Sequence, residues 1–472
     1  MFSVVEKYGS FLITFFSSLI LARLLTPSEI GVYSVGAAAV GIISTFRDFG
    51  ITNYLIQERN LTDTKIRTAL LIISIISLAL AFFVFILSGF MADYYDEPGI
   101  KKVLQVISLN FCLLPLSAIS MAMLRRDMRF REIAVIGLAS NLVSAICSIT
   151  LAYFDFGFIS LAWGGVSGAL TTVVCTRIMG NYVFRQPGYS DWKRIVSFGG
   201  FAGGTALANE GTIVAPDLII GKTLGFESAG LFSRAVGFVN IVNTIVLQAL
   251  YPVLVPALAN KARANEDLKP SMLTAVSYCI AIVWPACAWL SIFAEPAIVL
   301  LFGDQWKAAS AAASILAVKV AIDSIWVIMG SVLTATGQVE KMFSITSSVL
   351  VIEIVSLLAV SSFGLLWISA VLILLSLIRL ILIYSAVRTI VGFTLTDFGP
   401  QMLHGLLFVG MSVLMSLPFI PHWHGTAVDA WLVVPGGSVS VGVGWIVLLL
   451  VLKHPLLGEM KGVLGIKPRM KN

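Results

Sequence analysis

"LTPSEIGVYS", residues 25–34, returns in recognisable form as "LGFESAGLFS" at residues 224–233. In both stretches a leucine is followed by turn-forming residues, a glycine, an apolar residue, an aromatic residue and a serine. The glycines are Gly31 and Gly230, and the serines are Ser34 and Ser233, so both pairs have a separation of 199 residues. A loop this specific that recurs at one fixed spacing indicates that a large structural unit occurs twice in the chain.

The composition places this repeat in a membrane. Of the 472 residues, 58% are hydrophobic and only 12% are charged, and the mean hydropathy is +0.96, whereas about a quarter of a soluble domain is charged. Apolar runs such as 69–90, 103–124 and 365–387 are long enough to cross about 30 Å of hydrocarbon as helices. We therefore expect an all-α polytopic membrane protein. The net charge of +6 comes from short loops and forms no basic stripe interleaved with aromatic residues, so we expect no nucleic-acid partner.

Apolar runs between polar segments predict about fourteen transmembrane helices. The first six expected spans are 3–24, 32–57, 68–92, 103–124, 131–153 and 157–184. The next six are 195–220, 229–257, 271–294, 308–334, 342–362 and 364–390, and two more follow at 401–420 and 428–452. Lysine and arginine concentrate in the loops after even-numbered spans, which places both termini in the cytoplasm by the positive-inside rule. That orientation requires an even number of spans, in agreement with fourteen.

The repeat continues beyond the quoted loops. "LRRDMRFREIAVI" (124–136) occupies the place of "LTATGQVEKMFSI" (333–345), and "FGFISLAW" (156–163) that of "FGLLWISA" (363–370). Six expected helices separate the two loops, so both copies lie on the external face and the pseudo-two-fold axis runs along the membrane normal. We predict two six-helix lobes and a C-terminal extension: residues 1–190, residues 191–395, two additional helices within 396–455, and a basic cytoplasmic tail at 456–472.

Carboxylates within these spans are candidates for ion coupling, because a charge at mid-membrane costs about 2.5–3.5 kcal/mol on the insertion scale. Glu210 and Asp217 are seven residues apart and share one face of a helix, as a proton or cation pathway requires. Asp48 and Asp323 are further candidates. Each has a structural alternative: Asp217 as an interfacial residue, Asp48 as a helix-end cap, and Asp323 as the ion-pair partner of Lys319, four residues before it.

Arginines within the spans are candidates for binding phosphate, because a guanidinium matches phosphate oxygens in charge and geometry. The candidates are Arg47, Arg177, Arg234 and Arg379. We expect Arg177 and Arg379 toward the cytoplasmic ends of equivalent helices, where snorkelling to the interface is the alternative. Arg234 has no such route to the cytoplasmic interface, so phosphate binding and a purely structural role are equally favoured for it.

Amides on the eighth expected span form a polar set. Asn240, Asn243 and Gln248 recur at spacings of three and five residues. They suit hydrogen bonds to sugar hydroxyls, and they equally suit hydrogen bonds that bridge helices.

We expect neither catalysis nor a metal or other cofactor. The sequence contains no GxSxG or HExxH motif and no phosphate-cradling glycine loop. His422 and His424 form a His-x-His pair, but two ligands without a third nearby are a weak metal signal. No loop is long enough to form a soluble catalytic domain.

Several stretches resemble bacterial polysaccharide flippases, within the superfamily that also holds multidrug and toxic-compound extrusion proteins. "LARLLTPSEIGVYSVGAAAVGIISTFRDFGITNYLIQERNLT" (21–62) resembles the opening of that family, and "LRRDMRFREIAVI" (124–136) its connection between helices 4 and 5. "GLFSRAVGFVNIVNTIVLQALYPVLVPALANKAR" (230–263) resembles its helix 8, and "LFGDQWKAASAAASILAV" (301–318) its entry to helix 10. The resemblance covers residues 10–390, and the last two expected helices carry no such motif.

The resemblance implies a flippase that moves polyprenyl-pyrophosphate-linked oligosaccharides from the cytoplasmic to the periplasmic leaflet of the bacterial inner membrane, for exopolysaccharide or O-antigen synthesis. Its partners would be this lipid-linked substrate, the bilayer, a polysaccharide polymerase and export machinery, and a coupling H⁺ or Na⁺. The family's motif positions fall on Asp48, Phe49, Gly50, Arg234 and Ala235. Two alternatives stay open: a drug or metabolite antiporter of the same superfamily, and a membrane-embedded glycan polymerase or ligase.

Overall fold

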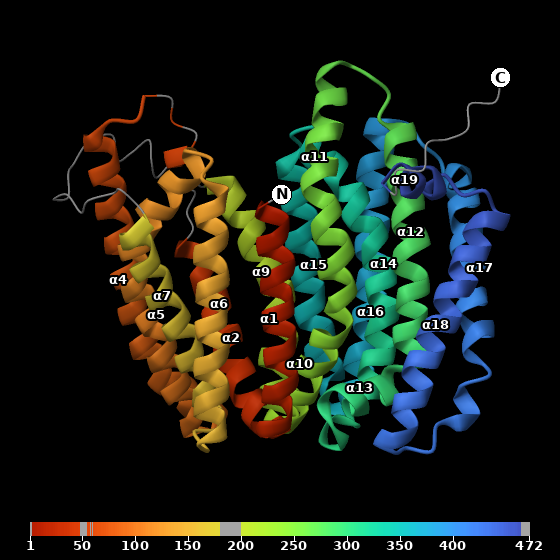
Figure 1. Ribbon diagram of the computed structural model, residues 1–472. Helices are drawn as coiled ribbons and strands as arrows, with labels where there is room; N and C mark the ends of the chain where they lie inside the picture. The colour runs from red at the N-terminus through yellow and green to blue at the C-terminus, as the bar shows by residue number, and fades with distance from the viewer. Residues whose placement is uncertain (1, 48–53, 57, 59, 180–199, 464–472) are drawn as a thin grey trace. The chain divides into compact units, whose positions relative to one another are not determined.

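The computed structural model of the chain describes residues 2–47, 54–56, 58, 60–179 and 200–463 (Figure 1). Helices form almost all of this described part, which contains no strand. Thirteen of the described helices are long and apolar enough to cross a membrane. The protein is therefore an all-α, multi-pass membrane protein, as the composition predicts.

The chain packs as two compact units, residues 1–233 and 234–472. The helices of the first unit are α1 (Phe2–Leu24), α2 (Pro27–Arg47), α4 (Asp63–Tyr95), α5 (Pro98–Arg126), α6 (Phe130–Tyr153), α7 (Ile159–Met179) and α9 (Gly200–Thr223). Helix α10 (Gly225–Val242) begins in the first unit and ends in the second.

The second unit continues from α10 through a π-helical turn, η1 (Asn243–Leu247). Its further helices are α11 (Gln248–Arg263), α12 (Lys269–Ile292), α13 (Ala294–Phe302), α14 (Ala309–Ala335), α15 (Val339–Val360), α16 (Leu365–Val391), α17 (Gly399–Ser416), α18 (Ala427–Val451) and α19 (Leu456–Val463). Short 3₁₀ turns link some of them: η2 (Asp304–Trp306), η3 (Ser361–Phe363), η4 (Leu395–Phe398) and η5 (Ile420–His422).

Local sequence signals explain where the helices begin and end, as the α4–α5 hairpin illustrates. The Thr62 side chain caps the first turn of α4, and the chain leaves that helix through Asp96, which adopts a left-handed conformation with φ 55°. Helix α5 then starts at Pro98, and the Glu97 carboxylate accepts a hydrogen bond from the Gly99 N–H at 2.8 Å. A two-residue connection therefore turns the chain back across the membrane.

The expected spans agree with the observed helices to within a few residues at most ends. The second expected span is an exception, since α2 ends at Arg47 and residues 48–53 lie outside the described part. The seventh expected span, 195–220, corresponds to α9, a 24-residue helix with two carboxylates and five glycines that is not among the thirteen apolar helices. The sequence did not predict α13, a nine-residue helix that ends at Gly303, where φ is 101°. The count of fourteen stays a prediction.

The unit boundary at 233/234 differs from the repeat boundary predicted near residue 190. Helix α9 packs against α2, so by packing it belongs with the first six helices. The duplicated lobes are defined by sequence and stay a prediction, whereas the two units are defined by contacts.

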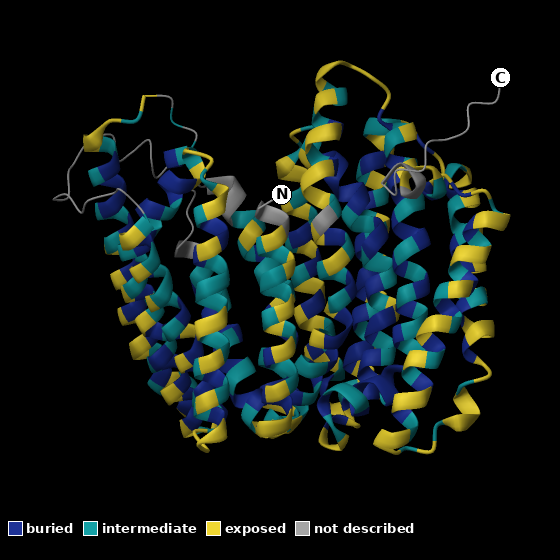
Figure 2. Cartoon of the chain, in the orientation of Figure 1, coloured by how far each residue is buried: buried dark blue, intermediate teal, exposed yellow. Residues whose placement is uncertain are grey.

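Exposed residues line the outer sides of several helices (Figure 2), and many of these residues are large and apolar. On α4, Phe82 and Phe90 are 67% and 65% exposed, and on α18 Trp431 is 71% exposed. A water-facing surface rarely gathers so many aromatic and aliphatic side chains. These faces are suited to hydrocarbon, as a polytopic membrane protein requires.

Candidate functional site

The most extensive group of ionisable side chains in the described part of the second unit joins α14, α15 and α16. Asp323 of α14 is its centre. Lys319 Nζ lies 2.6 Å from Asp323 Oδ2, Trp326 Nε1 donates to Asp323 Oδ1 at 2.7 Å, and the Ser376 hydroxyl of α16 donates to the same Oδ1. The Asp323 carboxylate is thus held by an ion pair and two hydrogen bonds.

Glu353 and Arg379 complete this group. Glu353 of α15 is 5% exposed and interacts electrostatically with Lys319 and Arg379. The Arg379 guanidinium of α16 lies 4.5 Å from the centre of the Trp326 ring. We call Lys319, Asp323, Trp326, Glu353, Ser376 and Arg379 the α14–α16 polar cluster. Its two cations balance its two carboxylates, which reduces the cost of burying four charges.

The predicted placement of Arg379 near the end of its helix is wrong. It lies near the middle of α16, twelve residues before the helix ends at Val391, and it is 9% exposed. Arg177, its expected counterpart, lies in the last turn of α7 and is exposed. Arg379 is buried because the carboxylates of α14 and α15 and the Trp326 ring lie around it.

Arg234 of α10 packs against two aromatic rings. Its guanidinium lies 4.7 Å from the ring centres of both Phe302, at the end of α13, and Trp306, in η2. Both aromatic side chains are almost fully buried. Cation–π contacts of this kind contribute about 0.5–2 kcal/mol each. Arg234 therefore fastens α10 to the segment "LFGDQW" (301–306), whatever else it binds.

The polar set of the eighth span surrounds the π-helical turn. Asn240 lies in the last turn of α10, Asn243 is the first residue of η1, and Gln248 is the first residue of α11. The Gln248 N–H donates to the Asn243 carbonyl, the i+5 bond of a π-turn. Asn240 and Gln248 are exposed. Single π-turns within α-helices are frequent at functional sites, because they re-aim neighbouring side chains.

The two carboxylates of α9 lie along the helix face that packs on α2. A Cβ atom built on Gly41 of α2 would lie 2.7 Å from Glu210 Oε1 and 3.3 Å from Val214. Gly221, one turn beyond Asp217, meets Val35 of α2 in the same way at 2.5 Å. Asp217 Oδ1 is buried and has no hydrogen-bond partner among the described residues. The predicted shared face therefore lies in the α2–α9 interface.

Two candidates cannot be placed in full. Arg47 is the last residue of α2, and its side chain lies outside the described part. Asp48 lies wholly outside the described residues, together with Phe49 and Gly50.

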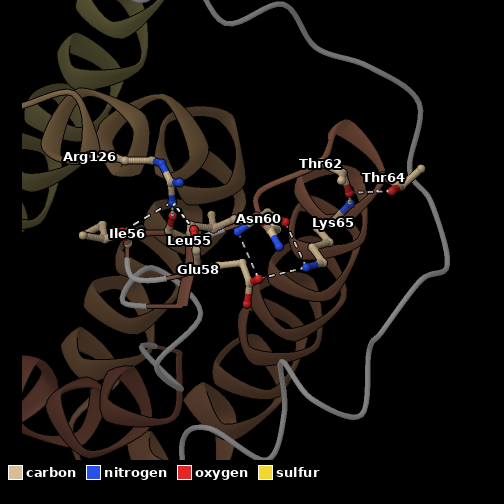
Figure 3. A network of polar contacts seen from close by, with 8 residues as sticks. All are labelled: Leu55, Ile56, Glu58, Asn60, Thr62, Thr64, Lys65 and Arg126. Carbon is tan, nitrogen blue, oxygen red and sulfur yellow. Dashed lines mark hydrogen bonds and ion pairs between the residues drawn. The ribbon is translucent and has the colours of Figure 1, made fainter.

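Two of the stretches singled out in the sequence meet at one end of the first unit (Figure 3). Arg126, the last residue of α5, donates from Nη1 to the carbonyl oxygens of Leu55, Ile56 and Glu58 at 2.7, 3.4 and 2.7 Å. The Glu58 carboxylate in turn pairs with Lys65 Nζ at 2.9 Å. One guanidinium thus holds Leu55, Ile56 and Glu58 against the end of α5.

The sequence reasoning missed several residues that the structure brings into these groups. Trp326 follows Lys319 and Asp323 at i+7 and i+3, so helical spacing alone could have indicated it. Phe302 and Trp306 fall within a stretch that was quoted for its resemblance, but no spacing rule links them to Arg234. Ser376 belongs to another helix, and no motif or spacing in the sequence indicates its contact with Asp323.

The chain is similar to several proteins of known name. The succinoglycan biosynthesis transport protein ExoT of Rhizobium meliloti (strain 1021) is 28% identical over 324 residues, 67% of this chain and 64% of ExoT. The lipopolysaccharide biosynthesis protein WzxC of Escherichia coli (strain K12) is 23% identical over 331 residues, 69% of this chain and 66% of WzxC. The chain thus matches somewhat less than two thirds of the length of these curated relatives.

A solved structure identifies the fold. The lipid II flippase MurJ, in an inward closed conformation, superposes with a TM-score of 0.72 over 96% of this chain and 99% of MurJ, at 14% sequence identity. The family described as polysaccharide biosynthesis protein matches residues 20–311. Because this match covers more than half of the sequence, the chain belongs to the polysaccharide biosynthesis protein family.

Proposed function

We propose that this protein is a flippase for polyprenyl-pyrophosphate-linked oligosaccharide repeat units, which it moves from the cytoplasmic to the periplasmic leaflet of the bacterial inner membrane. The observation that carries this proposal is the family match over residues 20–311, in a chain built almost entirely of membrane helices. ExoT, by its name, is a transport protein of succinoglycan biosynthesis, and WzxC a protein of lipopolysaccharide biosynthesis. The product would enter exopolysaccharide or O-antigen assembly.

The chemistry of the described residues supports a polar head group as cargo. The π-turn presents Asn240 and Gln248 beside Asn243, and amides form the directional hydrogen bonds that sugar hydroxyls need. Arg47, Arg177 and Arg234 are the proposed pyrophosphate ligands, although Arg234 also has a packing role. Arg379 stays a weaker candidate, because the α14–α16 polar cluster surrounds it.

A coupling ion would bind at a carboxylate. Asp217 is the leading candidate in the described part, because its buried Oδ1 lacks a hydrogen-bond partner there and would gain a proton or a cation at little cost. Glu210 shares its helix face, and Asp48 stays a candidate on its motif position. Asp323 is less favoured, since Lys319, Trp326 and Ser376 already satisfy its carboxylate.

Orientation and partners complete the proposal. Both termini would face the cytoplasm, as the loop charges predict. A polysaccharide polymerase and export machinery would receive the translocated units, and H⁺ or Na⁺ would drive the cycle.

The decisive experiment measures in which leaflet the lipid-linked repeat unit accumulates in cells that lack this protein. A flippase predicts accumulation on the cytoplasmic leaflet, relieved by the intact gene. A polymerase or ligase predicts single units on the periplasmic leaflet. An antiporter predicts no accumulation, and that result would refute the proposal in cells without a second flippase.

Variants then test the polar set. The double variant Asn240→Ala with Gln248→Ala should relieve the accumulation of the lipid-linked repeat unit poorly, because the sugar loses two hydrogen-bonding side chains at the π-turn. Ser438→Ala is the matched control, since this exposed serine of α18 donates to the Val434 carbonyl of its own helix and to no other group among the described residues. Equal rescue by both variants, at equal protein level, would remove the polar set from the substrate site.

A further inference from the structure

The duplicated loop that opens the sequence contacts its own copy. A Cβ atom built on Gly31 of α2 would lie 1.7 Å from the Phe226 carbonyl oxygen, and one built on Gly230 of α10 would lie 1.8 Å from the Pro27 carbonyl oxygen. Each glycine Cα thus lies directly against the backbone of the opposite helix. No other residue permits this approach, because any side chain would overlap the carbonyl.

These contacts are reciprocal with respect to the repeat. Pro27 and Phe226 are equivalent positions in the two copies, as are Gly31 and Gly230. Gly31 contacts Phe226 and Gly230 contacts Pro27, so the two contacts are the same contact made from either copy. Ser34 Oγ donates to Ser233 Oγ at 2.9 Å, and these serines are themselves equivalent, 199 residues apart. A contact between a residue and its own repeat equivalent lies on the pseudo-two-fold axis.

A second layer of contacts lies beside this pair. The Tyr95 hydroxyl at the end of α4 donates to the Leu218 carbonyl of α9 at 2.9 Å. Lys222 Nζ lies 3.6 Å from the Asp96 carboxylate and 4.8 Å from the Tyr94 ring centre. All of these residues lie within the first unit, at the helix ends that the loop charges assign to the external face.

The types of contact are those of an interface that can separate. Backbone packing, hydroxyl hydrogen bonds and one exposed ion pair hold the α2–α10 contact and the layer beside it. None of the groups in these contacts is a buried charge that would be left unpaired in lipid when the helices separate. Both glycines are buried, so the contact is tight while it lasts.

We propose that Pro27, Gly31 and Ser34 of α2, together with Phe226, Gly230 and Ser233, form the external closure of the translocation path, which opens and re-forms once in each transport cycle. The loop occurs twice because its two copies are the two halves of one seal. This inference rests on the proposed function only in calling the path a translocation path; the closure itself needs no particular substrate.

Cross-linking tests the closure directly. In a background without Cys112, Cys147, Cys175, Cys279 and Cys287, the pair Ser34→Cys and Ser233→Cys should form a disulfide in native membranes, because their side chains already touch. Denaturation and maleimide labelling should show the loss of two thiols per chain, and each single cysteine is a control. The oxidised protein should lose repeat-unit translocation and regain it on reduction.

Glycine variants test the same closure without a cross-link. Gly230→Ala should prevent the seal and raise the rate at which a membrane-impermeant maleimide labels Ser34→Cys from the external side. Gly237→Ala is the matched control on α10, because no described atom outside its own helix backbone lies within 4 Å of a Cβ built there. In this control, the labelling rate of Ser34→Cys should equal the rate in the protein that carries Ser34→Cys alone.

Three outcomes overturn the closure: no disulfide in the double-cysteine protein, full translocation by a completely cross-linked protein, or an unchanged labelling rate in folded Gly230→Ala. Failure of the proposed function gives a different pattern. Cross-linking and labelling would then behave as expected, while lipid-linked repeat units would show no dependence on the protein.

Discussion

Neutralising Asp323 tests whether the α14–α16 polar cluster is structural or part of ion coupling. Asp323→Asn would leave the Lys319 ammonium without the carboxylate that now lies 2.6 Å away. Breaking a buried pair costs about 3–5 kcal/mol and an exposed one at most about 1 kcal/mol. The two side chains are 31% and 17% exposed, so we expect about 3 kcal/mol. In a unit of roughly 240 residues this lowers Tm by about 6 °C.

A double-mutant cycle isolates the pair. Lys319→Met should destabilise the protein by a similar amount, and Lys319→Met with Asp323→Asn should lie within about 1 kcal/mol of the wild type. The coupling energy is then about 5 kcal/mol, because two independent losses of about 3 kcal/mol would add. The assay is thermal unfolding of the detergent-purified protein, followed by tryptophan fluorescence. Glu295→Gln is the matched control, because Glu295 pairs with Lys307 at 2.9 Å in the same unit but both side chains are well exposed.

Translocation then separates the two roles of Asp323. A structural pair predicts that the double variant regains both stability and translocation. If Asp323 couples an ion to transport, the double variant regains stability but not translocation. If the double variant is as unstable as the sum of the single variants, the reasoning is refuted, because Lys319 and Asp323 are then not energetically coupled.

Three further predictions concern single side chains. Arg126→Met should lower the free energy of unfolding by about 3 kcal/mol, because a hydrogen bond from a charged donor contributes about 1.5–3 kcal/mol. Arg126 Nη1 donates to three carbonyls, two of them at 2.7 Å. Arg125→Met changes the exposed neighbouring arginine and should have little effect in the same thermal assay. Arg234→Lys should lower the free energy of unfolding by about 1–2 kcal/mol, because the two ring contacts weaken. Translocation should then fall only as far as the protein level falls. A loss of translocation at normal protein level would instead show that Arg234 binds the substrate. Burial, and then the charge of His404, lower the pKa of His454, so the unfolded protein binds a proton at a higher pH than the folded one. Stability should therefore fall as pH drops below about 6.5, and this slope should be weaker in His454→Gln; an equal slope in both proteins would exclude His454 as its source.

Hydrophobic segments were sufficient to predict most of the helices. Long apolar runs predicted the helices closely, because in a bilayer each span must satisfy its own backbone hydrogen bonds and be apolar outside. Helix α13 escaped prediction, since its nine residues are too few to cross a membrane and fall almost entirely between the spans expected at 271–294 and 308–334. The unit boundary also escaped prediction, because it depends on how α9 packs against α2.

The candidate residues were harder to predict than the helices. Spacing along one helix correctly paired Lys319 with Asp323. Partners on other helices could not be predicted in this way, because a single sequence does not reveal which helix faces meet. Arg379 shows the consequence: it was expected toward the cytoplasmic end of its helix, whereas Trp326 and the carboxylates of α14 and α15 surround it near the middle of α16.

The reciprocal Gly31–Gly230 contact also has an evolutionary consequence. An interface in which one residue meets the equivalent of its own partner is what two identical chains form when they associate as a two-fold dimer. After such chains are fused, the two copies of the interface can no longer drift independently, because a side chain gained at either glycine overlaps a carbonyl of the other half. In a chain built from two such repeats, as the sequence predicts, the halves are free to diverge along most of their length, whereas the ten-residue loop stays recognisable in both.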